Sequence, residues 1–373
     1  MNGGTITGLL DGEMIRFTAS PASPFVLRHL PLLGRLYLLS RMYGAQPRGL
    51  KQTLISALAL RAYRALRSAG YGGTGIVQLR RPDGQRDLKF DVRNTQFHAL
   101  YMAELLPTYE PETTALIGRL VGTMDTFFDI GANWGWHCVV IASQPGFTGT
   151  VHAFEPYPPS FADLVSIVSQ AGLTELVHCH DLALGNSDGE ATMLMPDGIH
   201  SGVATLEERR WRGLAAGGGM PVKLARLDSL NLPPPSVIKL DVEDHEYEVL
   251  EGARQVIATA RPFLIFESLS DPRRPHATAT PLRLLEEWNY RLYFHAWLAE
   301  DGTPWNRVFD VATGKWDGVS WSGGAAQFAL VPFSRFYRGL LAKLTNIVAL
   351  PLERVAEVKA TLERETQMPM CDR

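Results

Sequence analysis

The stretch Phe127-Phe128-Asp129-Ile130-Gly131-Ala132-Asn133-Trp134-Gly135-Trp136 decides the fold of this 373-residue chain. A short apolar run ends in an acidic residue, and a Gly-x-Asn-x-Gly turn then leads into a helical stretch. Gly131 permits the tight turn, and Gly135 lets the backbone approach a ligand without a Cβ. The free N–H groups of the new helix suit a carboxylate. A purely structural glycine turn is the alternative. The cofactor contacts that we predict here are Asp129, Gly131, Asn133 and Gly135.

From this stretch onward, short apolar runs alternate with helical stretches, which is typical of parallel βαβ units. We predict strands at 126–130, 150–154, 176–179, 237–240 and 263–266. The predicted helices are 135–143, 159–171 and 246–259. Apolar runs at 291–294 and 326–331 can close the sheet. The fold class is therefore α/β, with a doubly wound sheet that binds its ligand where the strand order reverses.

Three regions are predicted along the chain. Residues 1–95 form a basic extension with helices at 30–43 and 53–68 and a hairpin at 75–92. Residues 96–335 form the main domain, and residues 336–373 form a C-terminal helical tail. Within the main domain, the glycine-rich stretch 183–227 is interpreted as an inserted hairpin and loop beside the site.

Charge is unevenly distributed. The formal net charge of −3 argues against bulk nucleic-acid binding. The first 82 residues nevertheless carry 11 Lys+Arg against only Asp11 and Glu13. The helices of this region either pack as a cap on the core or form a basic amphipathic surface for an anionic membrane or a lipid-linked substrate.

The composition predicts a cytoplasmic protein. Three cysteines provide no disulfide framework, which fits reduced thiols. The first 25 residues lack the pattern of a secretory signal, and no apolar stretch is long enough for a membrane-spanning helix. Peripheral membrane contact is compatible with this location, and the oligomeric state is left open.

A second segment, His152-Ala153-Phe154-Glu155-Pro156, places a carboxylate at the end of the next strand. There Glu155 can accept hydrogen bonds from both hydroxyls of a ribose, with Pro156 beside it. An ordinary surface glutamate is the alternative. Asp181 follows the third strand and can meet an adenine amino group or the adjacent backbone, or it can cap the loop.

The third segment, Ile238 to Ala253, brings two carboxylates to the end of the fourth strand. Asp241 and Glu243 suit the polarisation of an acceptor hydroxyl and removal of its proton, although helix capping explains either one alone. His245 is a second base candidate or an anchor for the helix start. No metal site is predicted, and a divalent ion at the two carboxylates is the alternative. His200 and Ser201 in the insert are candidate acceptor contacts.

In these segments the chain resembles the FkbM-type methyltransferases. The resemblance rests on 128–136, 153–156 and 238–253, supported by 109–112 and 226–230, and covers roughly residues 100–270. It implies a class I, Rossmann-like methyltransferase fold, S-adenosylmethionine (SAM) as cofactor, and O-methylation of hydroxyls on sugars, glycans or natural products. Two positions depart from the family: Asp244 stands where glycine is common, and His137 where a small or tyrosine-like residue is common.

We therefore predict a SAM-dependent O-methyltransferase in which Asp241 or Glu243 assists deprotonation of a small-molecule or glycan acceptor. Two other classes stay open. One is a SAM-binding protein without catalysis, which the carboxylates at 241 and 243 disfavour. The other is a nicotinamide-dependent oxidoreductase, which the absence of Gly-x-Gly-x-x-Gly spacing disfavours.

Overall fold

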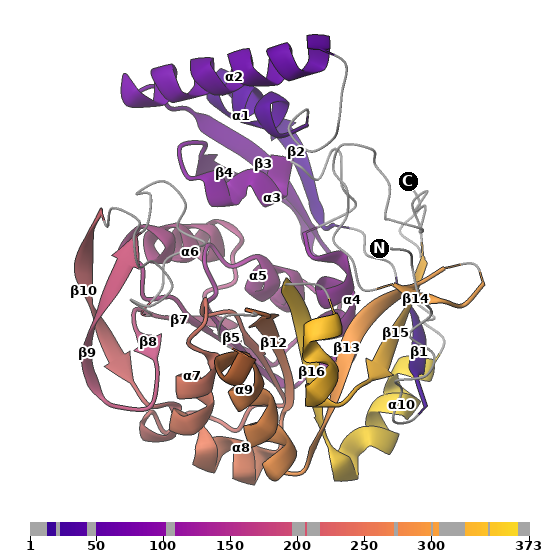
Figure 1. The fold of residues 1–373 in the computed structure, drawn as a ribbon. Coiled ribbons are helices and arrows are strands. Elements are labelled where there is room, and N and C mark those ends of the chain that lie inside the picture. Colours follow the sequence, from indigo (N-terminus) through magenta and orange to yellow (C-terminus); the bar gives the residue numbers. More distant parts are fainter. Residues whose placement is uncertain are drawn as a thin grey trace.

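The computed structural model describes residues 13–19, 23–42, 50–101, 109–195, 206, 217–271, 275–299, 301–305, 325–341 and 344–364. A main α/β unit is built on a ten-stranded sheet, and a smaller unit from the N-terminal part of the chain lies at one end of it (Figure 1). The site is positioned by the way these two units meet.

Five parallel strands form one half of the main sheet, in the order β12-β11-β5-β6-β7. They are β5 (Thr126–Ile130), β6 (Thr150–Phe154), β7 (Val177–His180), β11 (Val237–Leu240) and β12 (Phe263–Leu269). The order reverses at β5, because β6 and β7 extend the sheet to one side of it and β11 and β12 to the other. The predicted doubly wound sheet is confirmed, and its switch point lies at the end of β5.

The side chains of these strands alternate between the two faces of the sheet, so both faces are apolar and both are covered by helices. Phe127 belongs to the core cluster shared with the helices of one face, and its neighbour Phe128 to that of the other. The first face carries α4 (Pro111–Leu120), α5 (Trp136–Ala142) and α6 (Pro158–Gln170). The second carries α7 (Glu246–Gly252), α8 (Arg254–Ala260) and α9 (Pro275–Glu287).

The other half of the sheet is antiparallel, and part of its composition was not predicted. Its strands are β1 (Ile15–Ala19), β13 (Tyr290–Leu298), β15 (Ala326–Pro332) and β16 (Leu344–Pro351), with the short β14 (Pro304–Trp305) paired to β13. A helical tail was predicted for residues 336–373. This prediction is wrong for Leu344–Pro351, which forms β16 between β12 and β13. Ile347 and Val348 are β-branched, point to opposite faces and are both fully buried, which favours a central strand over a helix. The C-terminal helix follows as α10 (Val355–Glu363), after the 3₁₀ turns η7 (Arg335–Leu340) and η8 (Leu352–Arg354).

The N-terminal unit combines a three-stranded sheet with a pair of helices. Its elements are β2 (Phe25–His29), α1 (Leu32–Met42), α2 (Leu50–Ser68), β3 (Thr74–Arg81) and β4 (Gly84–Asp91). The helices and the hairpin were predicted, whereas β1 and β2 were not. η2 (Thr95–Phe97) and α3 (His98–Tyr101) then lead toward the main unit.

This unit packs on the loop that follows β5. The ring of Phe25 lies 5.0 Å from that of Trp136, and Phe97 lies 5.1 Å from Trp134, between ring centroids. Trp134 also donates its indole N–H to the carbonyl of Gln96 at 3.2 Å. The N-terminal unit therefore lies at the carboxyl edge of the parallel strands, where ligands bind in such sheets.

The insert contributes a small second sheet beside the parallel edge strand β7. Its strands, in the order β8-β10-β9, are β8 (Ala183–Leu184), β9 (Gly189–Met195) and β10 (Gly217–Ala225). The antiparallel pairing of β9 with β10 confirms the predicted hairpin. The 3₁₀ turn η6 (Leu227–Ser229) follows, and most of the loop predicted between β9 and β10 lies outside the described residues.

We expect Gly252→Ala to destabilise the fold, because a Cβ at this position would lie 1.8 Å from the carbonyl oxygen of Gly185. Backbone atoms cannot give way cheaply, so the free energy of unfolding should fall by about 1–3 kcal/mol, the usual cost of overpacking. Gly339→Ala is the matched control, since its Cβ would meet no atom within 4 Å. Denaturant titration of both variants measures the effect, and equal stabilities would contradict the packing of α7 against β8.

Candidate active site

The loop after β5 is held by its backbone. Gly131 has a φ of +80°, and a Cβ there would lie 1.8 Å from the carbonyl oxygen of Asp241, so no other residue fits without displacing β11. The N–H groups of Gly131 and Ala132 both donate to the carbonyl of Phe154 at 3.0 Å. Gly135 has a φ of +94° and begins α5. The two predicted glycines thus shape the turn, and Gly131 also lines the pocket above the switch point.

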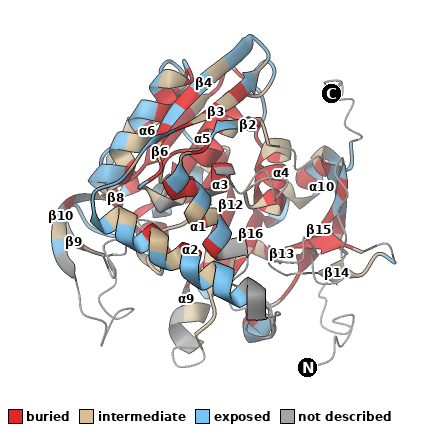
Figure 2. Ribbon diagram, turned by 90° about the horizontal axis from the view of Figure 1, so that it is seen from above, coloured by how far each residue is buried: buried red, intermediate tan, exposed pale blue. Residues whose placement is uncertain are grey.

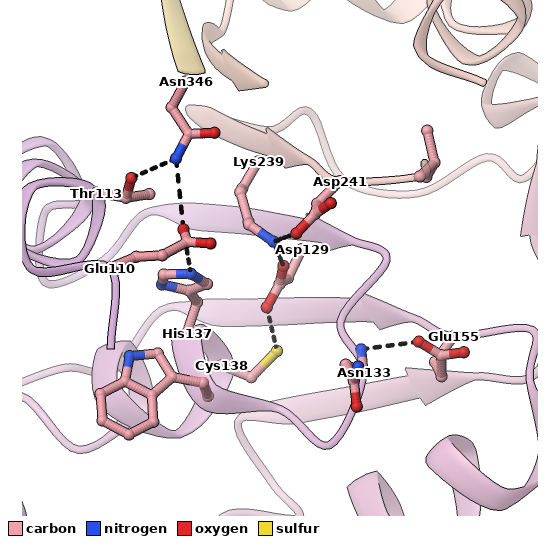
Figure 3. A network of polar contacts seen from close by, with 12 residues as sticks. Glu110, Thr113, Asp129, Asn133, His137, Cys138, Glu155, Lys239, Asp241 and Asn346 are labelled. Atoms are coloured by element: carbon pink, nitrogen blue, oxygen red, sulfur yellow. Dashed lines mark hydrogen bonds and ion pairs between the residues drawn. The ribbon is translucent and has the colours of Figure 1, made fainter. Parts of the chain in front are cut away.

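Glu155 lies directly beside this loop, as predicted. It is buried, and its two carboxylate oxygens accept hydrogen bonds from the N–H groups of Asn133 and Tyr157, each at 2.8 Å (Figure 3). Burial raises the pKa of Glu155 to about 7, although the two backbone hydrogen bonds oppose this shift. Each carboxylate oxygen retains acceptor capacity for a further donor. Glu155 and Pro156 both line the pocket.

Asp129 lies beneath the pocket and not in its wall. It is 1% exposed, accepts a hydrogen bond from the thiol of Cys138 at 3.0 Å, and has Lys239 Nζ at 3.9 Å from its second oxygen. A direct contact of Asp129 with a cofactor therefore stays a prediction, whereas its contact with a buried ammonium is observed. Asp181 is half exposed, lies 3.3 Å from Lys223 Nζ, and is outside the described pocket lining.

Lys239 is a central residue to which the sequence analysis gave no role. Its ammonium is buried and lies 3.1 Å from Asp241 Oδ2 at the end of β11 (Figure 3). Burial opposes its charge, but the negative charges of Asp241, Asp129 and Glu110 outweigh burial and raise the pKa of Lys239. Lys239 and Asp241 are two residues apart along the chain, so strand alternation was the available signal.

Three carboxylates face one another on the opposite side of the pocket from Glu155. Asp241 and Glu243 follow β11, and Glu267 lies on the neighbouring β12, one residue beyond the Phe266 that pairs with Leu240. One oxygen from each of the three lies within 4.8 Å of the others, a spacing that can hold a metal ion. Burial and the charges of Asp241 and Glu243 raise the pKa of Glu267 well above its ordinary value. Glu267 was not among the predicted site residues.

A polar cluster that begins just before α4 forms another part of the pocket wall. It was not predicted from the sequence as part of the site. Glu110 Oε2 lies 3.7 Å from His137 Nε2, and Asn346 of β16 donates to Glu110 at 3.4 Å (Figure 3). The amide of Asn346 also contacts Thr113 at 2.7 Å. Burial alone would raise the pKa of Glu110, but His137 and the charge of Lys239 lower it to about 2. Glu110 is thus an anion fixed at the pocket wall.

The remaining predicted residues divide into two groups. His245 lines the pocket at the start of α7, where its Nδ1 lies 3.6 Å from Glu248 and its ring makes no capping hydrogen bond. Its role as a base stays a prediction. His200 and Ser201 lie outside the described residues. Of the predicted residues, the structure therefore gathers around one pocket Gly131, Asn133, Glu155, Pro156, Asp241, Glu243 and His245, whereas Gly135 lies outside its described lining.

Comparison with known proteins relates the part of the chain that carries most of this pocket to a family. Residues 129–292 match the model of the methyltransferase FkbM domain. The hexuronic acid methyltransferase AglP of Haloferax volcanii is 28% identical over 149 residues, which are 38% of this chain and 55% of AglP. The chain thus spans about half the length of that curated relative.

Two solved structures are similar to the chain. The FkbM methyltransferase of Methylobacillus flagellatus KT has a TM-score of 0.36 and 16% identity, covering 64% of this chain and 53% of that one. The O-methyltransferase TomG of Streptomyces achromogenes, solved with SAM, has a TM-score of 0.32 and 14% identity, covering 65% and 91%. From the family match and the curated relative we conclude that residues 129–292 form a domain of the FkbM methyltransferase type.

Proposed function

We propose that the chain is an O-methyltransferase that acts on a hydroxyl of a sugar, glycan or natural product. The observation that carries this proposal is the cluster of Asp241, Glu243 and Glu267, which lines the same pocket as Glu155 and Asn133. A cofactor side and a side able to accept a proton are thus separated across one cavity. This arrangement supports transfer to a group that loses a proton as it is methylated.

The residues on the first side fit the cofactor. Asn133 Oδ1 is buried and has no hydrogen-bond partner within the described part of the chain, so it can accept a hydrogen bond from the amino group of SAM. Glu155 can accept from the ribose hydroxyls with the lone pairs that its two backbone donors leave. When bound, SAM supplies a methyl group on a positively charged sulfur, which passes to an oxygen nucleophile.

The carboxylates on the second side have different roles. Lys239 fixes the position of Asp241 through their 3.1 Å contact, so Asp241 can orient the acceptor. Glu267 binds a proton more readily than an ordinary glutamate, because it is buried beside Asp241 and Glu243. The hydroxyl proton of the acceptor therefore passes to the carboxylate cluster, with Glu243 and Glu267 as the receiving groups. Positioning of the acceptor oxygen supplies the rest of the rate enhancement.

The charge of the pocket favours a neutral or cationic acceptor. Among its described lining residues are five carboxylates and one lysine, namely Glu110, Glu155, Asp241, Glu243, Glu267 and Lys239. Lys239 is already engaged by Asp241 and Asp129, so its charge is not available to a substrate carboxylate. We therefore propose a neutral sugar or related polyol, in contrast to the hexuronic acid named for AglP.

We expect Glu155→Gln to weaken SAM binding by roughly 1.5–3 kcal/mol, the usual scale for a hydrogen bond to a charged group. The pKa of about 7 adds a pH signature. The diol needs an ionised acceptor, so the affinity of the native protein should fall as the pH drops below about 7. The affinity of the variant should stay flat.

Isothermal titration with SAM between pH 5.5 and 8 measures both effects. This range runs from roughly one and a half units below the pKa of Glu155 to about one unit above it. Glu175→Gln, an exposed glutamate before β7, is the control. A native affinity independent of pH, or unchanged in Glu155→Gln, would contradict the assignment. Tight binding of NAD in place of SAM would contradict the choice of cofactor.

We expect Asp241→Asn, Glu243→Gln and Glu267→Gln to keep SAM affinity within about threefold, because the cofactor contacts lie on the other side of the pocket. At least one of them should lose on the order of 10²-fold in kcat, the scale of general-base catalysis. Glu287→Gln, an exposed glutamate on α9, is the matched control. Activity should survive a chelator. If a chelator abolishes turnover and Mg²⁺ restores it, the three carboxylates hold a metal ion and the base assignment is wrong.

The acceptor class is tested with radiolabelled SAM and matched pairs of neutral glycosides and hexuronic acids. We expect kcat/KM for the neutral member to exceed that for the anionic member by at least about tenfold, which corresponds to one unfavourable charge interaction of about 1.4 kcal/mol. Preference for the hexuronic acids would contradict the proposed acceptor charge. Tight SAM binding without transfer to any hydroxyl would instead support a SAM-binding protein without catalysis.

A further inference from the structure

The N-terminal unit carries an unusually one-sided charge. From Phe25 to Asp91, the span of β2 to β4, the chain has 12 Lys+Arg against three acidic residues, whereas the other 306 residues have 24 Lys+Arg and 36 Asp+Glu. Positive charge is therefore concentrated in the N-terminal unit, and the rest of the chain is acidic on balance. Such a separation of charge orients a protein against a surface of opposite sign.

The outward face of α2 combines this charge with exposed leucines. Leu54 is 54% exposed and Leu58 is 61% exposed. Leu54, Leu58 and Arg61 follow an i, i+4, i+7 spacing, so they form a single stripe along the helix, with the exposed Arg64 beside it. The opposite face is buried through Ala59 and Tyr63.

The shorter helix α1 repeats this pattern. Leu32 is 64% exposed, Leu39 is also exposed, and the exposed Arg35 lies between them on the same side. Its inner face packs on α2 through Tyr37, whose ring centroid lies 5.3 Å from that of Tyr63. Seen from above, the two helices run across the end of the molecule with exposed residues along α2 (Figure 2). We call Leu32, Arg35, Leu39, Leu54, Leu58, Arg61 and Arg64 the leucine–arginine face.

We propose that the leucine–arginine face docks on an anionic lipid bilayer. Leucines on one side of an amphipathic helix enter the boundary between headgroups and acyl chains, while arginines reach the phosphates above them. A nucleic acid would match the arginines but offers the leucines no apolar partner. A second copy of the chain would match the leucines but would bring like charges together. An anionic bilayer offers an apolar layer to the leucines and phosphates to the arginines.

The rest of the structure agrees with attachment from one side. Among the described residues, none of the helices is long and apolar enough to cross a membrane. The N-terminal unit packs on the loop after β5 through Phe25 and Trp136, so the docking face and the pocket lie toward the same end of the molecule. The acidic remainder of the chain would be repelled by the same anionic surface. Docking would thus hold the pocket near the bilayer while the main unit stays in water.

Co-sedimentation of the full chain with vesicles tests the proposal. We expect binding to vesicles of phosphatidylcholine mixed with phosphatidylglycerol, little binding to phosphatidylcholine alone, and weaker binding at high salt. Arg61→Gln/Arg64→Gln should lower the partition coefficient roughly 25-fold, since each basic residue near an anionic surface contributes about fivefold. Leu54→Ser/Leu58→Ser should lower it as well, and this loss should persist at high salt.

Matched controls separate docking from general effects. Leu352→Ser removes a leucine that is 51% exposed on η8, and Arg283→Gln removes an exposed arginine on α9, so neither should change vesicle binding. SAM affinity should be native in all variants, which separates failed docking from failed catalysis. Equal binding by all variants, or negligible binding of the native chain at low salt, would overturn the proposal. A dimer in sedimentation velocity that Leu54→Ser/Leu58→Ser dissociates would assign the face to a second copy instead.

Discussion

The buried ammonium of Lys239 is the interaction on which the site depends. It lies between Asp129 at the end of β5 and Asp241 at the end of β11, the two strands that meet at the switch point. A charge without partners in this position would be prohibitively costly, so the three side chains form one unit. These three side chains fix the position of Asp241, whose backbone carbonyl packs directly against Gly131. The cofactor loop and the acceptor side are therefore set relative to each other by a single ion-pair network.

The strand pattern made the parallel half of the sheet predictable. Each apolar run there except 176–179 is followed by a helix, and the carboxyl ends of parallel strands share one edge, so Glu155 and Asp241 were expected to meet. Both line one pocket. Local sequence was sufficient because the contacts of these residues follow from strand order alone.

Other parts of the site depend on contacts that no local pattern encodes. Glu267 has the sequence context of an ordinary strand residue, and it reaches the pocket only because β12 lies beside β11. Glu110 precedes a helix, and Asn346 belongs to a segment predicted as helical tail. They meet because β16 lies between β12 and β13, an antiparallel insertion that joins distant parts of the chain. Long-range strand pairing of this kind depends on the sheet as a whole and cannot be read from a local segment.

The position of β16 also determines when the site can form during synthesis. Its residues Leu344–Pro351 follow β12 and β13 in the sequence, yet they fill the gap between these two earlier strands, and Asn346 pairs in register with Glu267. On the ribosome, β12 and β13 would each have an open hydrogen-bonding edge until this segment emerges. The parallel half can assemble first, since its strands are neighbours along the chain. The wall formed by Glu110, Asn346 and Glu267 is thus completed only after β16 has been made, so a chain terminated before Leu344 would retain the cofactor loop but lack part of that wall.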